Sequence, residues 1–116
     1  MIETMEQSKD NVLGFRAVGD ITKEDYSTLG PAVSAAVDEY GTVRLLIDLT
    51  DFKKEKAEAW GSDLGFGKQY HDKIERMALV GDQSWGPHVA KIAQPFYAQS
   101  VEWFDTDDDA WTWVEG

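Results

Sequence analysis

The order of hydrophobic and polar positions predicts strands and helices that alternate along most of the chain. Apolar and branched residues run almost without a break through 43–52 (VRLLIDLTDF), as in a strand buried on both faces. Shorter runs at 75–82 and 100–105 predict two more strands. Apolar residues recur at helical spacing within 21–41, 57–74, 84–96 and 106–116. Such alternation predicts an α/β domain whose parallel strands are joined by right-handed crossovers.

The first 18 residues predict an antiparallel hairpin at one edge of the sheet. Segments 1–5 and 12–18 have the pattern of short strands, and the polar SKDN stretch between them favours a turn. With 116 residues, the chain has the usual size of one domain. The prediction is a single domain over residues 1–116, with about five mixed strands, this hairpin and about four helices.

Local signals predict where the first and last helices begin and end. Thr22 and Asp25 have capping-box spacing, and Gly41 suits a helix end. Gly30 and Pro31 interrupt the helical periodicity of apolar residues within 21–41. This interruption predicts that the regular helix begins near Pro31. Thr106, with Asp109 three residues later, predicts the start of the terminal helix.

Charge and composition narrow the classes of function. The net charge of −11 argues against nucleic acid and against simple electrostatic docking to anionic lipid, because both need clustered cations. A basic run at Lys53, Lys54 and Lys56 is a local exception. The absence of cysteine excludes disulfides, thiolate metal sites and cysteine nucleophiles. The polar N-terminal segment and the lack of a run near ~20 apolar residues favour a cytoplasmic protein.

Carboxylates follow the predicted strands, where ligands of open α/β sheets usually bind. Asp48 and Asp51 end the long apolar run, and Asp82 and Asp105 follow the other two strands. Such groups can hold Mg²⁺. A simpler interpretation is that Asp82 and Asp105 cap the following helices or shape their turns. We therefore expect no metal or cofactor and no enzyme, and we keep a metal-dependent enzyme as a second alternative.

Other catalytic motifs are not supported by the sequence. A triad of Ser84, His88 and Asp82 can be drawn, but it lacks the G-x-S-x-G elbow in which such a serine sits. No glycine-rich phosphate loop follows a strand. Nucleotide binding is therefore not expected.

Aromatic residues concentrate in the two middle predicted helices. Gly61, Gly65 and Gly67 weaken the first of these helices, each by about 1 kcal/mol in a helix interior. A weak helix can open and uncover an apolar pocket, although the same aromatics can simply pack on the sheet. The hypothetical pocket is lined by Trp60, Leu64, Phe66, Trp85, Ile92 and Phe96.

Short motifs in the C-terminal part of the chain resemble the SpoIIAA-like family, which is related in fold to STAS domains. They are Val80-Gly81-Asp82, Trp85, Pro95-Phe96, Trp103-Phe104 and Trp113-Val114. The hairpin, VRLLIDLTDF and Trp60 with LGFG extend the match over nearly the whole chain. The resemblance implies a STAS-like sheet with helices, similar also to CRAL-TRIO lipid-binding domains. It also implies that the protein associates with membranes or binds a small ligand, and that it has no known catalytic activity.

One departure from related proteins affects the expected regulation. Anti-sigma-factor antagonists carry a phosphorylated serine after the strand that corresponds to VRLLIDLT. This chain has no serine or threonine between Asp51 and Trp60, so the resemblance does not extend to that phospho-switch or to the partner-switching that depends on it.

Together, these observations favour a non-catalytic binding domain. Its expected ligand is an apolar or lipid-like small molecule in the hypothetical pocket, with peripheral membrane contact as a related expectation. The alternative is a protein-interaction or regulatory module of STAS type without the phospho-switch, which binds a protein partner or a second copy of itself.

Overall fold

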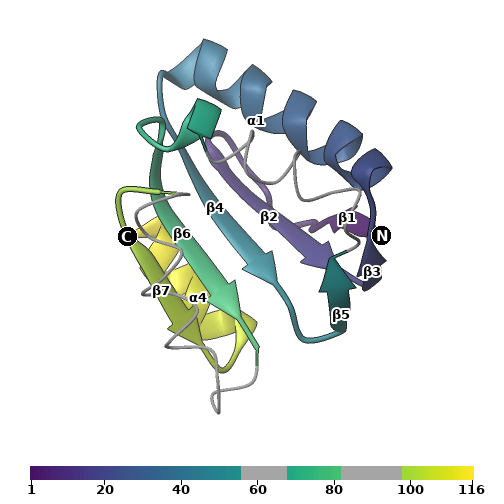
Figure 1. Ribbon diagram of the computed structural model, residues 1–116. Coiled ribbons are helices and arrows are strands. Elements are labelled where there is room, and N and C mark those ends of the chain that lie inside the picture. The colour runs from purple at the N-terminus through teal and green to yellow at the C-terminus, as the bar shows by residue number, and fades with distance from the viewer. Residues whose placement is uncertain (56–67, 82–97) are drawn as a thin grey trace.

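The computed structural model, which describes residues 1–55, 68–81 and 98–116, contains a five-stranded mixed sheet (Figure 1). Its strand order is β1-β2-β4-β6-β7. β1 is antiparallel to β2, and all other neighbours are parallel. The α/β fold class and the N-terminal hairpin are therefore confirmed. The strands are β1 (Ile2–Thr4), β2 (Val12–Ala17), β4 (Val43–Asp48), β6 (Ile74–Val80) and β7 (Val101–Phe104).

A second, two-stranded parallel sheet pairs β3 (Gly19–Ile21) with β5 (Phe52–Glu55). The apolar run 43–52 is thus divided between two sheets, whereas the sequence pattern predicted one strand. The division follows from Asp48, whose Oδ1 accepts the N–H of Thr50 at 2.9 Å and closes an Asx turn. β3 begins at Gly19, which has a positive φ of 65° that glycine adopts readily.

Helices cover both faces of the main sheet. α1 (Tyr26–Tyr40) follows the short 3₁₀ helix η1 (Lys23–Asp25), and α4 (Asp107–Glu115) lies on the opposite face (Figure 1). Successive β4 residues point to the two faces: Leu45 joins the core beneath α1, and Leu46 joins the core beneath α4. Within the described ranges, no helix is long and apolar enough to cross a membrane.

α1 begins earlier than the sequence predicted. It starts at Tyr26 and continues through Pro31, although proline removes a backbone donor inside a helix. Leu29 and Val33, which lie on either side of the proline, are both buried in the core. This packing outweighs the local cost of the proline. The predicted end is confirmed, because Gly41 has φ of 85° and donates its N–H to the Val37 carbonyl at 2.8 Å.

The predicted helix 57–74 is too long at its C-terminal end. Residues 68–70 are helical, 71–73 form a turn, and Ile74 already begins β6. His71 and Ile74 fall within the predicted range but lie beyond the helical residues, and Ile74 is buried as the first residue of a central strand. The predicted helix 84–96 lies outside the described residues.

α4 is fixed at both ends by polar contacts. Its first turn is capped by Thr106, whose Oγ1 accepts the N–H of Asp109 at 3.3 Å, as the sequence predicted. At its last turn, the carbonyl of Trp113 accepts from Arg76 at 2.7 Å, and that of Val114 accepts from Arg44 at 3.1 Å. Cations at this end also suit the helix dipole. The helix is thus tied to β4 and β6 by its backbone as well as by its apolar side chains.

Candidate functional site

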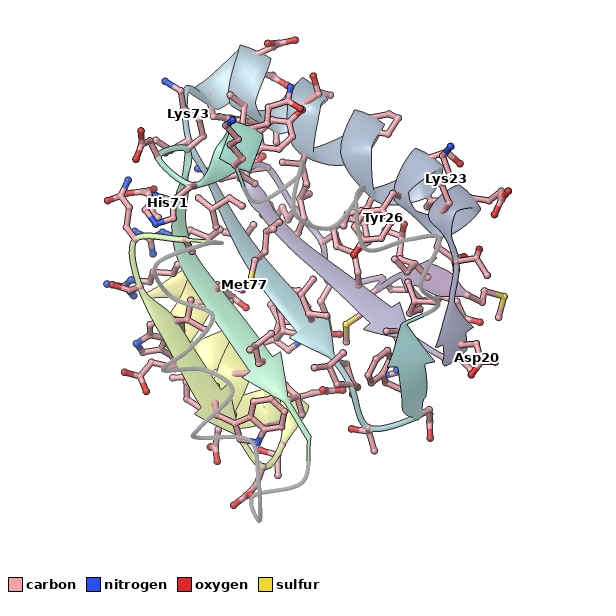
Figure 2. The ribbon with its side chains drawn as sticks, in the orientation of Figure 1. Asp20, Lys23, Tyr26, His71, Lys73 and Met77 are labelled. Carbon is pink, nitrogen blue, oxygen red and sulfur yellow. The ribbon has the colours of Figure 1, made fainter. Side chains whose placement is uncertain are left out.

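The carboxyl ends of β2, β4 and β6 meet at one edge of the sheet, here called the carboxyl edge. Arg16, Asp48 and Val80 occupy neighbouring positions in one row across these strands. The small sheet β3–β5 begins beyond the same edge (Figure 1). His71 and Lys73 lie at the opposite end of the sheet from Asp20 (Figure 2). The carboxyl edge is therefore where a ligand or metal site built on the strand-end aspartates would lie.

Asp48 is the centre of a charged cluster at this edge, which we call the acid–arginine cluster (Arg16, Asp48 and Asp107). Its side chain is almost completely buried, with 3% of the residue exposed. Arg16 Nε donates to Asp48 Oδ2 at 3.3 Å, and Arg16 Nη2 donates to Asp107 Oδ2 at 3.4 Å. One guanidinium therefore joins β2, the end of β4 and the first residue of α4.

The two carboxyl groups of the cluster have pKa values shifted in opposite directions. Burial raises the pKa of Asp107, and hydrogen bonding to Asp48 and repulsion by its charge raise it further. Burial alone would raise the pKa of Asp48 too, but hydrogen bonds from Thr50, Asp107 and Arg16 outweigh it and lower that pKa. Carboxyl pairs separated in this way can divide acid and base roles. Here, however, Asp48 is already engaged by Thr50 and Arg16, so the cluster serves first as a tether for α4.

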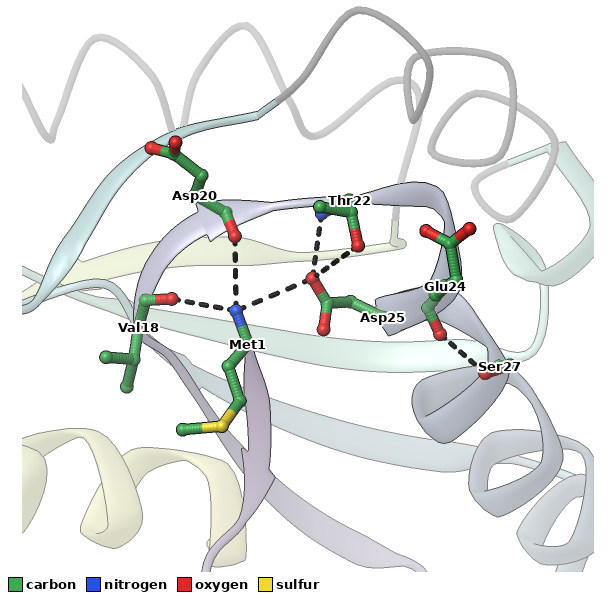
Figure 3. Close-up of polar contacts among 7 residues, drawn as sticks. All are labelled: Met1, Val18, Asp20, Thr22, Glu24, Asp25 and Ser27. Carbon is green, nitrogen blue, oxygen red and sulfur yellow. Dashed lines mark hydrogen bonds and ion pairs between the residues drawn. The ribbon is translucent and has the colours of Figure 1, made fainter.

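A second polar cluster, at the N-terminus, holds the start of α1 against the sheets (Figure 3). The amino group of Met1 donates to the carbonyls of Val18 at 2.8 Å and Asp20 at 3.2 Å, and it lies 3.5 Å from Asp25 Oδ2. The same carboxylate accepts the N–H of Thr22 at 2.7 Å and its hydroxyl at 3.2 Å. The predicted capping pair of Thr22 and Asp25 is confirmed, and it carries an additional ion pair.

Replacing Asp25 with asparagine is expected to lower the free energy of unfolding by about 1 kcal/mol at pH 7, as for the loss of a helix cap. Burial would raise the pKa of Asp25, but the bonds from Thr22 and the Met1 ammonium lower it. Its stabilisation is therefore complete above the unfolded pKa of about 3.9 and is lost as the pH falls through the folded pKa. Urea unfolding should show a difference between Asp25→Asn and wild type at pH 7 that disappears in acid. The exposed Glu24→Gln serves as the control, and a pH-independent difference for Asp25→Asn would contradict the assignment.

The hypothetical pocket lies outside the described residues. This holds for all six predicted lining residues: Trp60, Leu64, Phe66, Trp85, Ile92 and Phe96. Two described residues close in sequence to the predicted lining residues lie in the core. Tyr70 and Ala98 are both buried in the core beneath α1, in one cluster with Met77, Leu79 and Trp103. Tyr70 and Ala98 thus lie on the same face of the sheet.

The remaining strand-end candidates do not gather into a catalytic group in the described part of the chain. Asp51 and Asp105 are exposed, and Thr106 rather than Asp105 caps α4. Asp82, Ser84 and His88 lie outside the described residues. No three histidine or acidic side chains converge as a metal site within residues 1–55, 68–81 and 98–116. Among the described members of the predicted group, Asp48 alone is buried in a charged cluster.

Sequence reasoning missed Arg16 and Asp107 as partners of Asp48. A signal was present for Arg16, because it occupies an alternating position within the otherwise apolar strand 12–17, where an isolated charge needs a partner. Asp107 gave no such signal, since acids are common in the first turn of a helix. It is 91 residues from Arg16 in the sequence, and only the fold brings the two together.

Comparison with known proteins agrees with this architecture. An uncharacterised Shewanella loihica protein with a SpoIIAA-like fold superposes with a TM-score of 0.83 and 28% identity, covering 97% of this chain and 93% of that one. The anti-sigma factor antagonist SpoIIAA, in its unphosphorylated form, superposes with a TM-score of 0.68. The match covers 100% of this chain and 99% of that one. The sequence identity is 15%, so the superposition shows a shared fold.

At the level of sequence, no curated protein matches the chain significantly. The profile of the SpoIIAA-like family matches residues 12–115, which includes every strand of the sheet except β1. The chain therefore belongs to the SpoIIAA-like family.

Proposed function

We propose that this chain is a non-catalytic, cytoplasmic binding module that acts through a protein partner. The observation that carries the proposal is the full-length likeness to SpoIIAA, a protein named for antagonising another protein. A fold can host many functions, so the likeness alone is an analogy. The acid–arginine cluster adds support, because its buried carboxylate is engaged by backbone and guanidinium donors that hold the fold together.

The proposed module works without a phosphorylated serine at the position used by anti-sigma-factor antagonists. β5 ends at Glu55, and residues 56–60 (KAEAW) contain no hydroxyl side chain. Control by phosphorylation would require such a side chain to add charge and acceptor oxygens. We therefore expect the fraction of partner that is bound to be set by the expression level of the chain or by another ligand.

The charge of the chain specifies the chemistry expected of the partner. A net charge of −11 accelerates encounter with a basic surface and disfavours an acidic one. Affinity purification of the tagged chain from cells that naturally express it should recover a stoichiometric basic partner at low salt, and recovery should fall at high salt. Sedimentation of the purified chain distinguishes a second copy of itself as the partner. A monomer that recovers no stoichiometric partner at either salt concentration would contradict the proposal.

A second candidate function is the binding of an apolar or lipid-like small molecule between segments 60–70 and 85–96. It is supported by the common core position of Tyr70, which ends the first of these segments, and Ala98, which comes shortly after the second. Added fatty acid or phospholipid should change the tryptophan fluorescence of wild type. Trp60→Phe and Trp85→Phe should reduce this response, and Trp113→Phe on α4 should retain it. A response that is absent in wild type, or is unchanged in both pocket variants, would argue against the pocket.

A further inference from the structure

The carboxyl group of Asp107 presents an unusual arrangement of partners. Its Oδ2 accepts from Arg16, but its Oδ1 is buried and receives no hydrogen bond from any described group. An ionised carboxylate oxygen that is removed from water without a donor is costly. Asp48, which is buried, is the neighbouring carboxyl group, because its Oδ2 accepts from Nε of the same Arg16 guanidinium at 3.3 Å. Two carboxyl groups can bond to each other only if one of them holds a proton.

We propose that one proton shared between Asp48 and Asp107 latches the N-terminal end of α4 to the main sheet. With this proton, the acid–arginine cluster contains one guanidinium and one carboxylate and is neutral. Without it, the same site holds an uncompensated negative charge beside an oxygen to which no described group donates. Deprotonation therefore loosens the first turn of α4, whereas the last turn stays held by Arg44 and Arg76.

The charged groups around the pair are consistent with a latch of this kind. β2 contributes Arg16, the cation that the structure places on both acids, and β1 places Glu3 opposite Arg16 in the strand register. In the same row, β6 and β7 contribute the apolar Val80 and Phe104. The described residues within two positions of Asp107 in the sequence include three more acids: Asp105, Asp108 and Asp109. This surrounding negative charge favours retention of the shared proton.

The expected pH dependence has two limbs. The raised pKa of Asp107 contributes stability that is complete below the unfolded pKa of about 3.9 and is lost as the pH rises through its folded pKa. The lowered pKa of Asp48 contributes stability that is lost as the pH falls through its own folded pKa. The latch is therefore strongest between these two pKa values, where the pair holds one proton.

Carbon-13 NMR titration of the aspartate carboxyl groups in the wild-type chain tests the shared proton directly. The pair should titrate in two steps, one above and one below the ordinary aspartate pKa of about 3.9, and both steps belong to the pair as a unit. If both carboxyl groups titrate together near that value, the proposal is overturned. This experiment needs no variant, so it does not depend on whether a variant folds.

Hydrogen exchange tests the latch itself. The protection of α4 amides relative to α1 amides should fall in wild type as the pH rises from the ordinary aspartate pKa of about 3.9 through the folded pKa of Asp107, since the intrinsic pH effect on exchange cancels in the ratio. Asp107→Asn keeps a donor for Asp48 without a titrating proton, so its ratio should stay constant. Asp108→Asn, an exposed neighbour in the same helical turn, should retain the wild-type fall. A constant ratio in wild type, or the same fall in Asp107→Asn and Asp108→Asn, would overturn the proposal.

Discussion

Truncation of Trp111 to alanine is expected to lower the free energy of unfolding by about 3–5 kcal/mol, the range for loss of a large buried aromatic side chain. Trp111 is 5% exposed and belongs to the core beneath α4 with Leu46, Ala78 and Val80. The cavity left by its indole would lie at the centre of that core. Urea unfolding of wild type and Trp111→Ala, followed by circular dichroism, measures the difference.

Two further variants separate burial from other effects at this position. The Trp111 Nε1–H is buried and finds no acceptor among the described residues. Trp111→Phe keeps much of the apolar area and removes this unpaired donor, so its loss should be well below that of Trp111→Ala. Trp113→Ala, on the same helix but only partly buried, should also cost less. If Trp111→Ala cost no more than Trp113→Ala, our account of the α4 core would be wrong.

Substitution of Gly14 by alanine is expected to destabilise the protein by about 1–3 kcal/mol, as for an overpacked core. A Cβ at this position would lie 2.6 Å from Cζ2 and 2.7 Å from Cη2 of Trp111, and 3.1 Å from the sulfur of Met5. Both neighbours are buried, so neither ring nor thioether can move aside freely. The close approach of α4 to β2 therefore depends on the absence of a side chain at Gly14.

Gly30 offers a matched control for this substitution. It lies in α1, and an added Cβ would meet nothing within 4 Å apart from its chain neighbours and the helix's own backbone. Gly30→Ala should therefore change the free energy of unfolding much less than Gly14→Ala, because the gain in helix propensity is opposed by the restriction that Pro31 places on the residue before it. Trp111→Phe should relieve part of the loss in Gly14→Ala, which a double-mutant cycle would detect as coupling. Equal effects of Gly14→Ala and Gly30→Ala would contradict the packing described for α4.

The elements that the sequence predicted well are those with strong local signals. The continuous apolar run at 43–48 and the cap formed by Thr106 needed no information from distant residues. β3 and β5 were not predicted as a separate sheet, because strands of three and four residues are too short to show a period. The sequence predicted that α1 begins near Pro31, whereas the helix begins at Tyr26. Tertiary packing of Leu29 and Val33 overrides the local preference against proline inside a helix.

The candidate site was predictable only in part. Asp48 could be identified because it ends a buried strand at the edge where α/β proteins bind ligands. Its partners could not, because the sequence gives no measure of which distant charges share a row across the sheet. The six aromatic and aliphatic residues of the hypothetical pocket remain a prediction from the sequence, supported by the positions of Tyr70 and Ala98.

The central claim is that this member of the SpoIIAA-like family binds a partner rather than catalyses a reaction. Native mass spectrometry of the chain purified at low salt, from cells that naturally express it, tests this claim most directly. We predict a stoichiometric complex with a basic protein that dissociates as salt is raised. An additional mass of small-molecule size that is lost on organic extraction would instead identify the apolar ligand. The mass of the bare chain at every salt concentration would contradict the claim that this protein is a binding module.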